Sequence, residues 1–230
     1  MKIELYDDRV GKVELVDHWG TDLTIINSAR VNFDVHETAL DDKDKKLIQT
    51  AVENQHTRNH HNGAMTFSFK VPLFVQYQHY RHTTWLYKEN IKTYTDENIE
   101  FYEQKLFRTQ SKNNRHTSHE NDLINPTMLH EDERGAVMLP ASDLLKEHHK
   151  MCLDFYKSMM LSGICREQAR GVLPQNLYTE YCGTVNLNNL LKFIKLGEHE
   201  SAKWEIVQVA KACREIALTL YPITLSAFGL

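Results

Sequence analysis

The sequence has few cysteines and no long apolar run. Its 230 residues include four cysteines, none in a CxxC pair, so a zinc ribbon is unsupported. No run approaches the roughly 18 apolar residues of a membrane helix, and the opening MKIELYDDRV has acids where a signal peptide is apolar. We therefore expect free, partly buried thiols in a cytoplasmic protein, or in a host cytoplasm if the source is viral, with no membrane partner.

The chain also lacks an excess of positive charge. It has 27 Lys and Arg against 31 Asp and Glu, a formal net charge of −4, so we expect no nucleic-acid partner. The phosphate-loop patterns GxxxxGK[ST] and GxGxxG are absent, as are the nucleophile elbow GxSxG and the zinc motif HExxH. These absences exclude several common routes to nucleotide, acyl-transfer and metalloprotease chemistry.

What the chain does have is enough length and apolar content for one core. Hydrophobic residues make up 41% and charged residues 25%, as in ordinary globular proteins. We expect a single domain over residues 1–230. Strands and helices are mixed without regular alternation, which favours an α+β fold.

Hydrophobic periodicity predicts the order of the elements. They are a hairpin of strands at 2–6 and 12–16, a helix capped by Asp22, a helix introduced by Asp41 and Asp42, a strand at 65–71, a helix opened by Pro72, a polar loop at 103–135, a helix at 142–162, a short helix before Pro174, a strand at 177–185, and helices at 187–196 and 200–220. The predicted core is Val13, Leu15, Ile25, Ile26, Leu47, Ile48, Phe67, Phe69, Phe74, Leu190, Leu191, Phe193, Ile206 and Ala210.

Histidine is in visible excess, with 13 residues. His79 and His82 are spaced i, i+3 on a predicted helix, a spacing that can hold a metal. No acid or thiol accompanies them at ligand spacing. Ordinary exposed or hydrogen-bonded histidines are therefore the favoured interpretation, and we predict no metal site.

Residues 78–89 (QHYRHTTWLYKE) combine cations, imidazoles, aromatic rings and a carboxylate. An Arg-His pair such as Arg81 and His82 at a helix end can bind phosphate or an electron-rich ring. A solvated helix end would look the same, because basic residues complement the helix dipole there. The spacing alone leaves both interpretations open.

Four collinear blocks, at 13–34, 45–82, 166–186 and 201–216, resemble the flavin-dependent thymidylate synthases of the ThyX type. The family signature RHRxxSxNExSxRY aligns with residues 81–94, RHTTWLYKENIKTY. Four of its positions match: Arg81, His82, Glu89 and Tyr94. Among the positions that differ, Thr83 and Thr93 replace arginines, Lys88 replaces the asparagine and Ile91 replaces the second serine.

The resemblance implies a homotetramer with a small mixed or antiparallel sheet packed with long helices. It also implies a reaction in which reduced FAD delivers hydride, methylenetetrahydrofolate supplies carbon, NADPH reduces the flavin, and dUMP becomes dTMP. By aligned position it assigns flavin contacts to His56, Arg81, His82 and Asn186, and nucleotide contacts to Gln78, Glu89 and Arg170. Lys88 and Lys92 are expected to replace, as point charges, the signature arginine lost at Thr93, and Glu89 and Lys203 are the expected catalytic residues.

A second departure lies at residues 196–203. In the family pattern LRxxxxAQ, the arginine is thought to stabilise the N3 anion of uracil, but here that position is Gly197 and the glutamine is Lys203. Three interpretations remain. Either dUMP is still the substrate, with Lys203, His199 or Lys88 supplying the charge, or the enzyme is a dCMP-directed methylase or hydroxymethylase, or the chain is a catalytically silent paralogue that still binds flavin or nucleotide. The first is the default.

Overall fold

The computed structural model describes residues 1–30, 36, 38–54, 56–89, 99–111, 118–132, 135–199 and 201–230. Contacts within the chain divide it into two compact units. The first comprises Met1–Val71, Val75–Thr95 and Thr179–Leu230, and the second comprises Pro72–Phe74 and Asp96–Tyr178.

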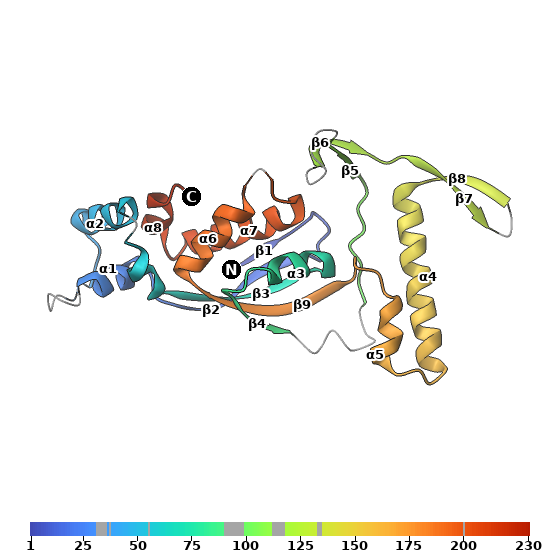
Figure 1. Ribbon diagram of the computed structural model, residues 1–230, viewed down its shortest axis with the longest axis horizontal. Coiled ribbons are helices and arrows are strands. Elements are labelled where there is room, and N and C mark those ends of the chain that lie inside the picture. The colour runs from blue at the N-terminus through green and yellow to red at the C-terminus, as the bar shows by residue number, and fades with distance from the viewer. Residues whose placement is uncertain are drawn as a thin grey trace. The chain divides into compact units, whose positions relative to one another are not determined.

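A five-stranded sheet organises the first unit (Figure 1). Its strands, in spatial order, are β1 (Lys2–Glu4), β2 (Lys12–Trp19), β3 (Ala64–Pro72), β9 (Tyr178–Asn186) and β4 (Leu86–Glu89). The pairs β1–β2, β2–β3 and β4–β9 are antiparallel. Along β3 the apolar side chains of Met65, Phe67 and Phe69 are buried while the residues between them are half-buried, so one face of the sheet faces the core.

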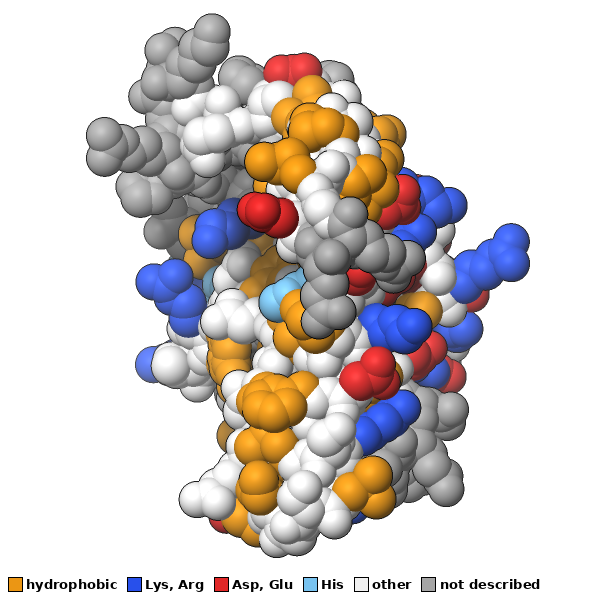
Figure 2. Space-filling model, turned by 90° about the vertical axis from the view of Figure 1, so that its right-hand side faces the viewer, with side chains coloured by type: hydrophobic (Ala, Val, Ile, Leu, Met, Phe, Trp, Pro, Cys, Tyr) orange, Lys and Arg blue, Asp and Glu red, His pale blue; other side chains and the backbone are white. Residues whose placement is uncertain are grey.

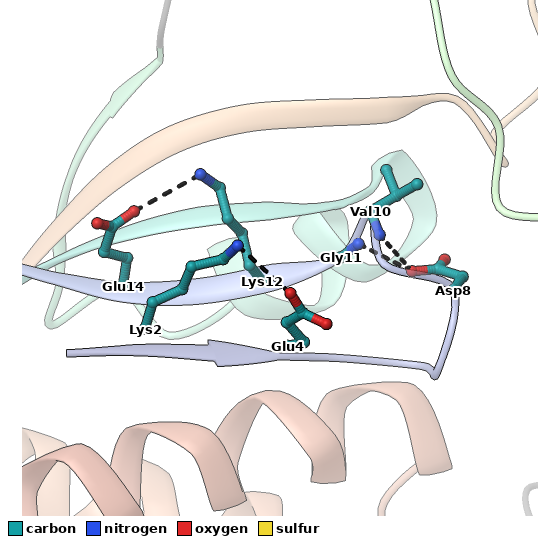
Figure 3. Close-up of polar contacts among 7 residues, drawn as sticks. All are labelled: Lys2, Glu4, Asp8, Val10, Gly11, Lys12 and Glu14. Atoms are coloured by element: carbon teal, nitrogen blue, oxygen red, sulfur yellow. Dashed lines mark hydrogen bonds and ion pairs between the residues drawn. The ribbon is translucent and has the colours of Figure 1, made fainter.

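The turn between β1 and β2 is held by one carboxylate (Figure 3). Asp8 accepts hydrogen bonds from the backbone N–H groups of Val10, at 2.8 Å, and Gly11, at 3.0 Å. A Cβ at Gly11 would lie 2.7 Å from the Tyr6 ring, so a larger residue there would force that ring to move. The predicted hairpin is therefore confirmed. Ion pairs also lie along its strands, Lys2–Glu4 at 3.4 Å and Lys12–Glu14 at 3.5 Å.

Helices complete the first unit: α1 (Asp22–Arg30), α2 (Asp42–Glu53), the 3-10 helix η2 (Thr57–His61), α3 (Leu73–Tyr80), α6 (Leu187–Gly197), α7 (Trp204–Leu218) and α8 (Pro222–Ala227). The helix predicted to be introduced by Asp41 is confirmed as α2, and Asp41 caps it in a capping box with Asp44. Much of the predicted core is buried, including Phe67, Phe69 and Phe193. Leu47 is 38% exposed, so its placement in the core was wrong.

Asp22 was predicted to cap the helix that follows it, and this was wrong. It is the first residue of α1, and its buried carboxylate instead accepts hydrogen bonds from Ile223 N–H (2.7 Å), Thr224 N–H (3.1 Å) and the Thr224 hydroxyl (2.5 Å). It therefore caps α8, 200 residues further along the chain. Burial raises the pKa of Asp22, and the hydrogen bonds to Thr224 and Ile223 oppose that rise.

The second unit contains two hairpins and a long helix. Its elements are β5 (Phe107–Gln110), β6 (Ser118–Ile124), β7 (Thr127–Asp132), β8 (Gly135–Pro140), α4 (Ala141–Leu161), α5 (Arg166–Ala169) and the 3-10 helix η4 (Arg170–Val172). The prediction of a loop at 103–135 was wrong, because β5 pairs with β6 and β7 with β8, both antiparallel. Neighbouring residues such as Met128 and Leu129 are both exposed. The strands therefore lack the apolar alternation by which a half-buried strand is recognised.

The mixed helix and strand content, with small antiparallel sheets, agrees with the predicted class. All four cysteines are free, and Cys213 is buried. Within the described ranges, no helix has the length and apolarity needed to cross a membrane.

Candidate active site

The C-terminal end of α3 is held by a tyrosine from β4. The hydroxyl of Tyr87 lies 2.7 Å from the carbonyl oxygen of His79 and 3.2 Å from that of His82, and donates to this pair of acceptors. The N–H of His82 also donates to the carbonyl of His79, at 2.9 Å. Because the last carbonyls of a helix lack partners within it, this hydroxyl acts as a cap. Burial raises the pKa of Tyr87, so the hydroxyl remains a donor.

Arg81 and His82 follow directly after this cap. Arg81 is exposed, whereas His82 is half-buried with its ring edge-on to Phe193 of α6, at 5.0 Å between centroids. Burial lowers the pKa of His82, and the neighbouring Arg81 lowers it further. The pair therefore presents a cation beside an imidazole that is neutral at pH 7.

His79 faces the core and not the candidate site. Its Nδ1 lies 2.8 Å from the Tyr181 hydroxyl, and its ring packs against Phe69, Trp85 and Phe193. Burial lowers its pKa to about 3, so the ring is neutral at physiological pH. The described part of the chain contains no cluster of three or more His, Cys, Asp or Glu residues that could hold a metal.

Tyr80 connects α3 to the carboxylate of β4. Its hydroxyl accepts from Gln76 at 2.9 Å and donates to Glu89 at 3.5 Å. Burial, and next the charge of Glu89, raise the pKa of Tyr80 to about 12. Lys88 and Glu89 are both exposed at this edge strand, and Gln78 is half-buried. The structure thus brings Gln78, Lys88 and Glu89 close to the Arg81–His82 turn.

Asn186 lies at the start of α6, and His56 lies at the start of η2, a 3-10 helix that contacts α6. Asn186 is the N-cap of α6, and its side-chain oxygen accepts from the N–H of Asn189 at 2.9 Å. His56 is the N-cap of η2. The N–H of Leu187 donates to the carbonyl of Gly63 at 2.8 Å, which ties the start of α6 to the residues after η2. His56 also borders a cavity of about 280 Å³ lined mainly by apolar residues of α1 and α2.

At the other end of α6, the backbone comes very close to α7. A Cβ at Gly197 would lie 2.5 Å from that of Ala210. The next residue, Glu198, forms an ion pair with Arg214 of α7, with its Oε1 2.9 Å from Nε. Sequence reasoning missed Arg214, because a spacing of 16 residues between the partners follows no local pattern. Lys203, the predicted catalytic lysine, is an exposed residue at the N-cap of α7.

Two predicted residues are not part of this arrangement as the structure describes it. Lys92 lies outside the described residues. Arg170 belongs to the second unit, where it is exposed at the start of η4. Their nucleotide roles remain predictions.

Residues 14–223 match the family described as thymidylate synthase complementing protein, and the chain belongs to that family. A similar curated relative is the flavin-dependent thymidylate synthase of Thermus thermophilus, 35% identical over 218 residues, or 95% of this chain and 75% of the relative. The flavin-dependent thymidylate synthase of Thermotoga neapolitana is 32% identical over 228 residues, 99% of this chain and 94% of the relative.

Two solved structures of a UMP/dUMP methylase, PolB from Streptomyces cacaoi, are also similar. The one bound with 5-Br UMP has a TM-score of 0.76 and 26% identity, and covers 99% of this chain and 96% of that one. The one bound with 5-Br dUMP has a TM-score of 0.74 and 27% identity, covering 99% and 97%. This chain therefore shares the fold of PolB.

The donor set of the site fits a flavin. A reduced isoalloxazine carries negative charge at N1 and needs donors at its polar edge. Arg81 supplies an exposed guanidinium, and His82 supplies a neutral imidazole whose position is fixed by Phe193. Asn186 can contribute only its amide N–H₂, since its oxygen is engaged in the helix cap.

Proposed function

We propose that this protein is a flavin-dependent thymidylate synthase that converts dUMP to dTMP. The observation that carries the proposal is the Arg81–His82 pair, which the Tyr87 hydroxyl holds at the end of α3 in a chain of this family. The pair stands where the family resemblance expects flavin contacts. A helix end surrounded by water would not need a hydroxyl group from a neighbouring strand to bind two of its carbonyl oxygens.

The reaction takes its one-carbon unit from methylenetetrahydrofolate and its reducing equivalents from NADPH. When bound, the reduced FAD supplies the hydride that completes the methyl group at C5. Arg81 and His82 bind and orient the flavin edge, with His56 and Asn186 contributing further donors. Asn186 donates through its amide N–H₂.

The residues that bind the nucleotide are those around β4, together with Arg170. Gln78 and Glu89 bind the nucleotide, and Lys88 and Lys92 supply positive charge in place of the family's missing arginine. Arg170 clamps the phosphate through its planar guanidinium. Glu89 and Lys203 are the proposed catalytic residues, a carboxylate acceptor and a cation at the pyrimidine.

We infer that the working form is a homotetramer whose sites are completed by neighbouring copies. Supporting this, the second unit exposes large apolar side chains, among them Met151 (61%) and Phe155 (55%) one turn apart on α4, and Leu129 (68%) and Met138 (56%) on the paired strands β7 and β8. Figure 2 shows groups of exposed apolar side chains on one face of the molecule. Such patches mark interfaces, and soluble oligomers are mostly symmetric assemblies of identical chains.

Light scattering tests this assembly. We expect a particle near four times the 26.9 kDa chain mass, and a smaller one for the Met151→Glu/Phe155→Glu variant. A monomeric and fully active wild type would contradict the tetramer. We further propose that both units act as one functional domain, since the family match spans both, and that the protein works in a cytoplasm, where its free thiols would stay reduced.

Substrate titration tests the proposed reaction. The purified protein should be yellow, and dUMP added with methylenetetrahydrofolate and NADPH should give dTMP by mass spectrometry. dCMP serves as the parallel substrate. Conversion of dCMP alone would assign the cytosine-directed reaction instead. Binding of flavin without conversion of either nucleotide would indicate a silent paralogue.

The flavin site is tested by Arg81→Ala, with Arg9→Ala as the control because Arg9 is an exposed arginine in the turn after β1. We expect Arg81→Ala to lose bound FAD and the control to retain it. Full flavin occupancy in Arg81→Ala would contradict the role assigned to Arg81.

A further inference from the structure

The close contact between α6 and α7 leaves no room for a side chain at residue 197. Gly197 is buried, and even a methyl group there would lie 2.5 Å from the Cβ of Ala210. Carbon atoms in contact are normally about 3.5–4.0 Å apart. The positive charge that the resemblance expects at this position therefore has to come from another residue.

Of the cations that the sequence suggests for this task, His199 is tied to its own loop, and Lys203 and Lys88 are exposed side chains. The Nδ1 of His199 lies 2.8 Å from the Ser201 hydroxyl and accepts from the Ser201 N–H at 3.2 Å, which ties the ring to the loop between α6 and α7. Lys203 is exposed at the start of α7, and its side chain makes no capping contact. Lys88 is exposed on the edge strand β4.

Arg214 brings a guanidinium to the same corner. It lies one turn beyond Ala210 on α7, and its Nε is 2.9 Å from the carboxylate of Glu198, the residue after Gly197. The Arg214 Nε and the Glu198 Oε1 are both buried, and among the described residues neither atom has a partner in hydrogen-bond geometry. The Nε–H therefore does not point at that oxygen, and the contact is an ion pair. The Arg214 side chain is 35% exposed. Glu198 therefore holds the guanidinium in place by charge while part of it remains accessible to a ligand.

This corner lies near the proposed flavin site. Phe193, on which the His82 ring rests, precedes Gly197 by four residues. Residues four apart share a face of a helix and are separated by about 6 Å along its axis. The end of α6 thus places Arg214 and Glu198 one turn beyond the residue that positions His82.

We propose that Arg214 binds the pyrimidine base of the substrate and stabilises negative charge on its N3–O4 edge, in the role that no side chain at residue 197 can fill. The assignment rests on the proposed function. A guanidinium carries several N–H donors in a plane and keeps its charge. Those donors match the carbonyl oxygens of uracil and the N3 nitrogen when it carries negative charge. Glu198 is a positioning residue that orients the guanidinium.

The test compares Arg214→Gln with Lys211→Ala, an exposed cation on the same helix, in FAD-loaded protein. For Arg214→Gln we expect dUMP binding at least about 10-fold weaker and kcat/KM lower by about 100-fold, with FAD occupancy unchanged. Guanidinium ion added to Arg214→Ala should restore part of the rate. Binding of deoxyuridine should weaken by the same factor as that of dUMP, because the contact is to the base and not to the phosphate.

A double variant separates this role from a structural one. Glu198→Gln/Arg214→Gln removes both charges and so leaves no buried charge unpaired. If Arg214 only supports the fold, the double variant should regain wild-type dUMP binding, and that result overturns the assignment, as does a normal kcat/KM in Arg214→Gln. If the wild type itself neither binds nor converts dUMP, the proposed function fails and the assignment falls with it.

Discussion

Gly197 offers a sharp test of how closely α6 and α7 pack. Gly197→Ala would place a methyl carbon 2.5 Å from the Cβ of Ala210. Contact between carbons requires about 3.5–4.0 Å, so the two helices would have to separate by about 1 Å or more. The helices cannot yield without disturbing the core, since Ile194 on α6 and Ala210 and Cys213 on α7 are fully buried.

The expected cost follows from this geometry. Extra methyl groups in a packed core typically cost about 1–3 kcal/mol. The better helix propensity of alanine over glycine stabilises a helix by at most about 1 kcal/mol, and by less at the final residue of α6. We therefore expect a net loss of about 1–2 kcal/mol. For a chain of this length each kcal/mol lowers Tm by about 2–4 °C.

Thermal unfolding followed by circular dichroism, at one protein concentration and saturating FAD, measures this loss. Ala210→Gly is the matched background, because it removes the atom with which the new methyl group collides. In that background Gly197→Ala should cost little or nothing, and the difference between the two costs is the coupling free energy of the pair. An unchanged or raised Tm for Gly197→Ala, or the same loss in both backgrounds, would refute the proposed contact.

Three further predictions concern polar groups that are buried or half-buried. Tyr87→Phe removes the hydroxyl that caps the carbonyls of His79 and His82, so FAD should bind about 5- to 10-fold more weakly in fluorescence titrations, from a loss of about 1 kcal/mol; unchanged affinity would contradict the cap. The pKa of His79 is about 3 when folded against 6.5 normally, so protonation favours the unfolded chain as pH falls below about 6.5. Wild type should thus lose about 2 kcal/mol more than His79→Gln between pH 7 and pH 5 in urea unfolding, and parallel losses would count against this. Asp22→Asn replaces one of the carboxylate oxygens that accept from the Ile223 and Thr224 N–H groups with an N–H₂ group. The free energy of unfolding in urea should fall by about 1–3 kcal/mol. A smaller fall than that caused by Asp42→Asn, a change at an exposed residue, would exclude the cap.

Local patterns in the sequence predicted the elements that carry their own signals. The hairpin around Asp8 and the helix introduced by Asp41 were confirmed because the turn and cap residues act on neighbouring backbone. The strands β5 to β8 were missed because residues such as Met128 and Leu129 are exposed side by side. Burial on one face creates the period-two pattern, so strands exposed on both faces do not show it.

For the site, the Arg81–His82 pair could be found because its residues are adjacent in sequence. The residues that position it could not. Tyr87 donates to carbonyls of a preceding helix, and Phe193 reaches the His82 ring from a segment more than 100 residues away. These contacts depend on the order of strands in the sheet and on the packing of α6 against it, and neither has a signal in local spacing.

The departures from the two family patterns are physically of two kinds. Thr83 and Lys88 are exposed, so exchanging side chains there alters charge without disturbing the packing. Gly197 is different because it is buried and its lack of a side chain sets the distance between α6 and α7. A larger residue at 197 would move α7 and with it Arg214, whose pairing with Glu198 depends on that distance. The position of the proposed cation near the pyrimidine, Arg214, therefore depends on the close packing of α6 against α7. An arginine restored at residue 197 would force the helices apart and displace Arg214.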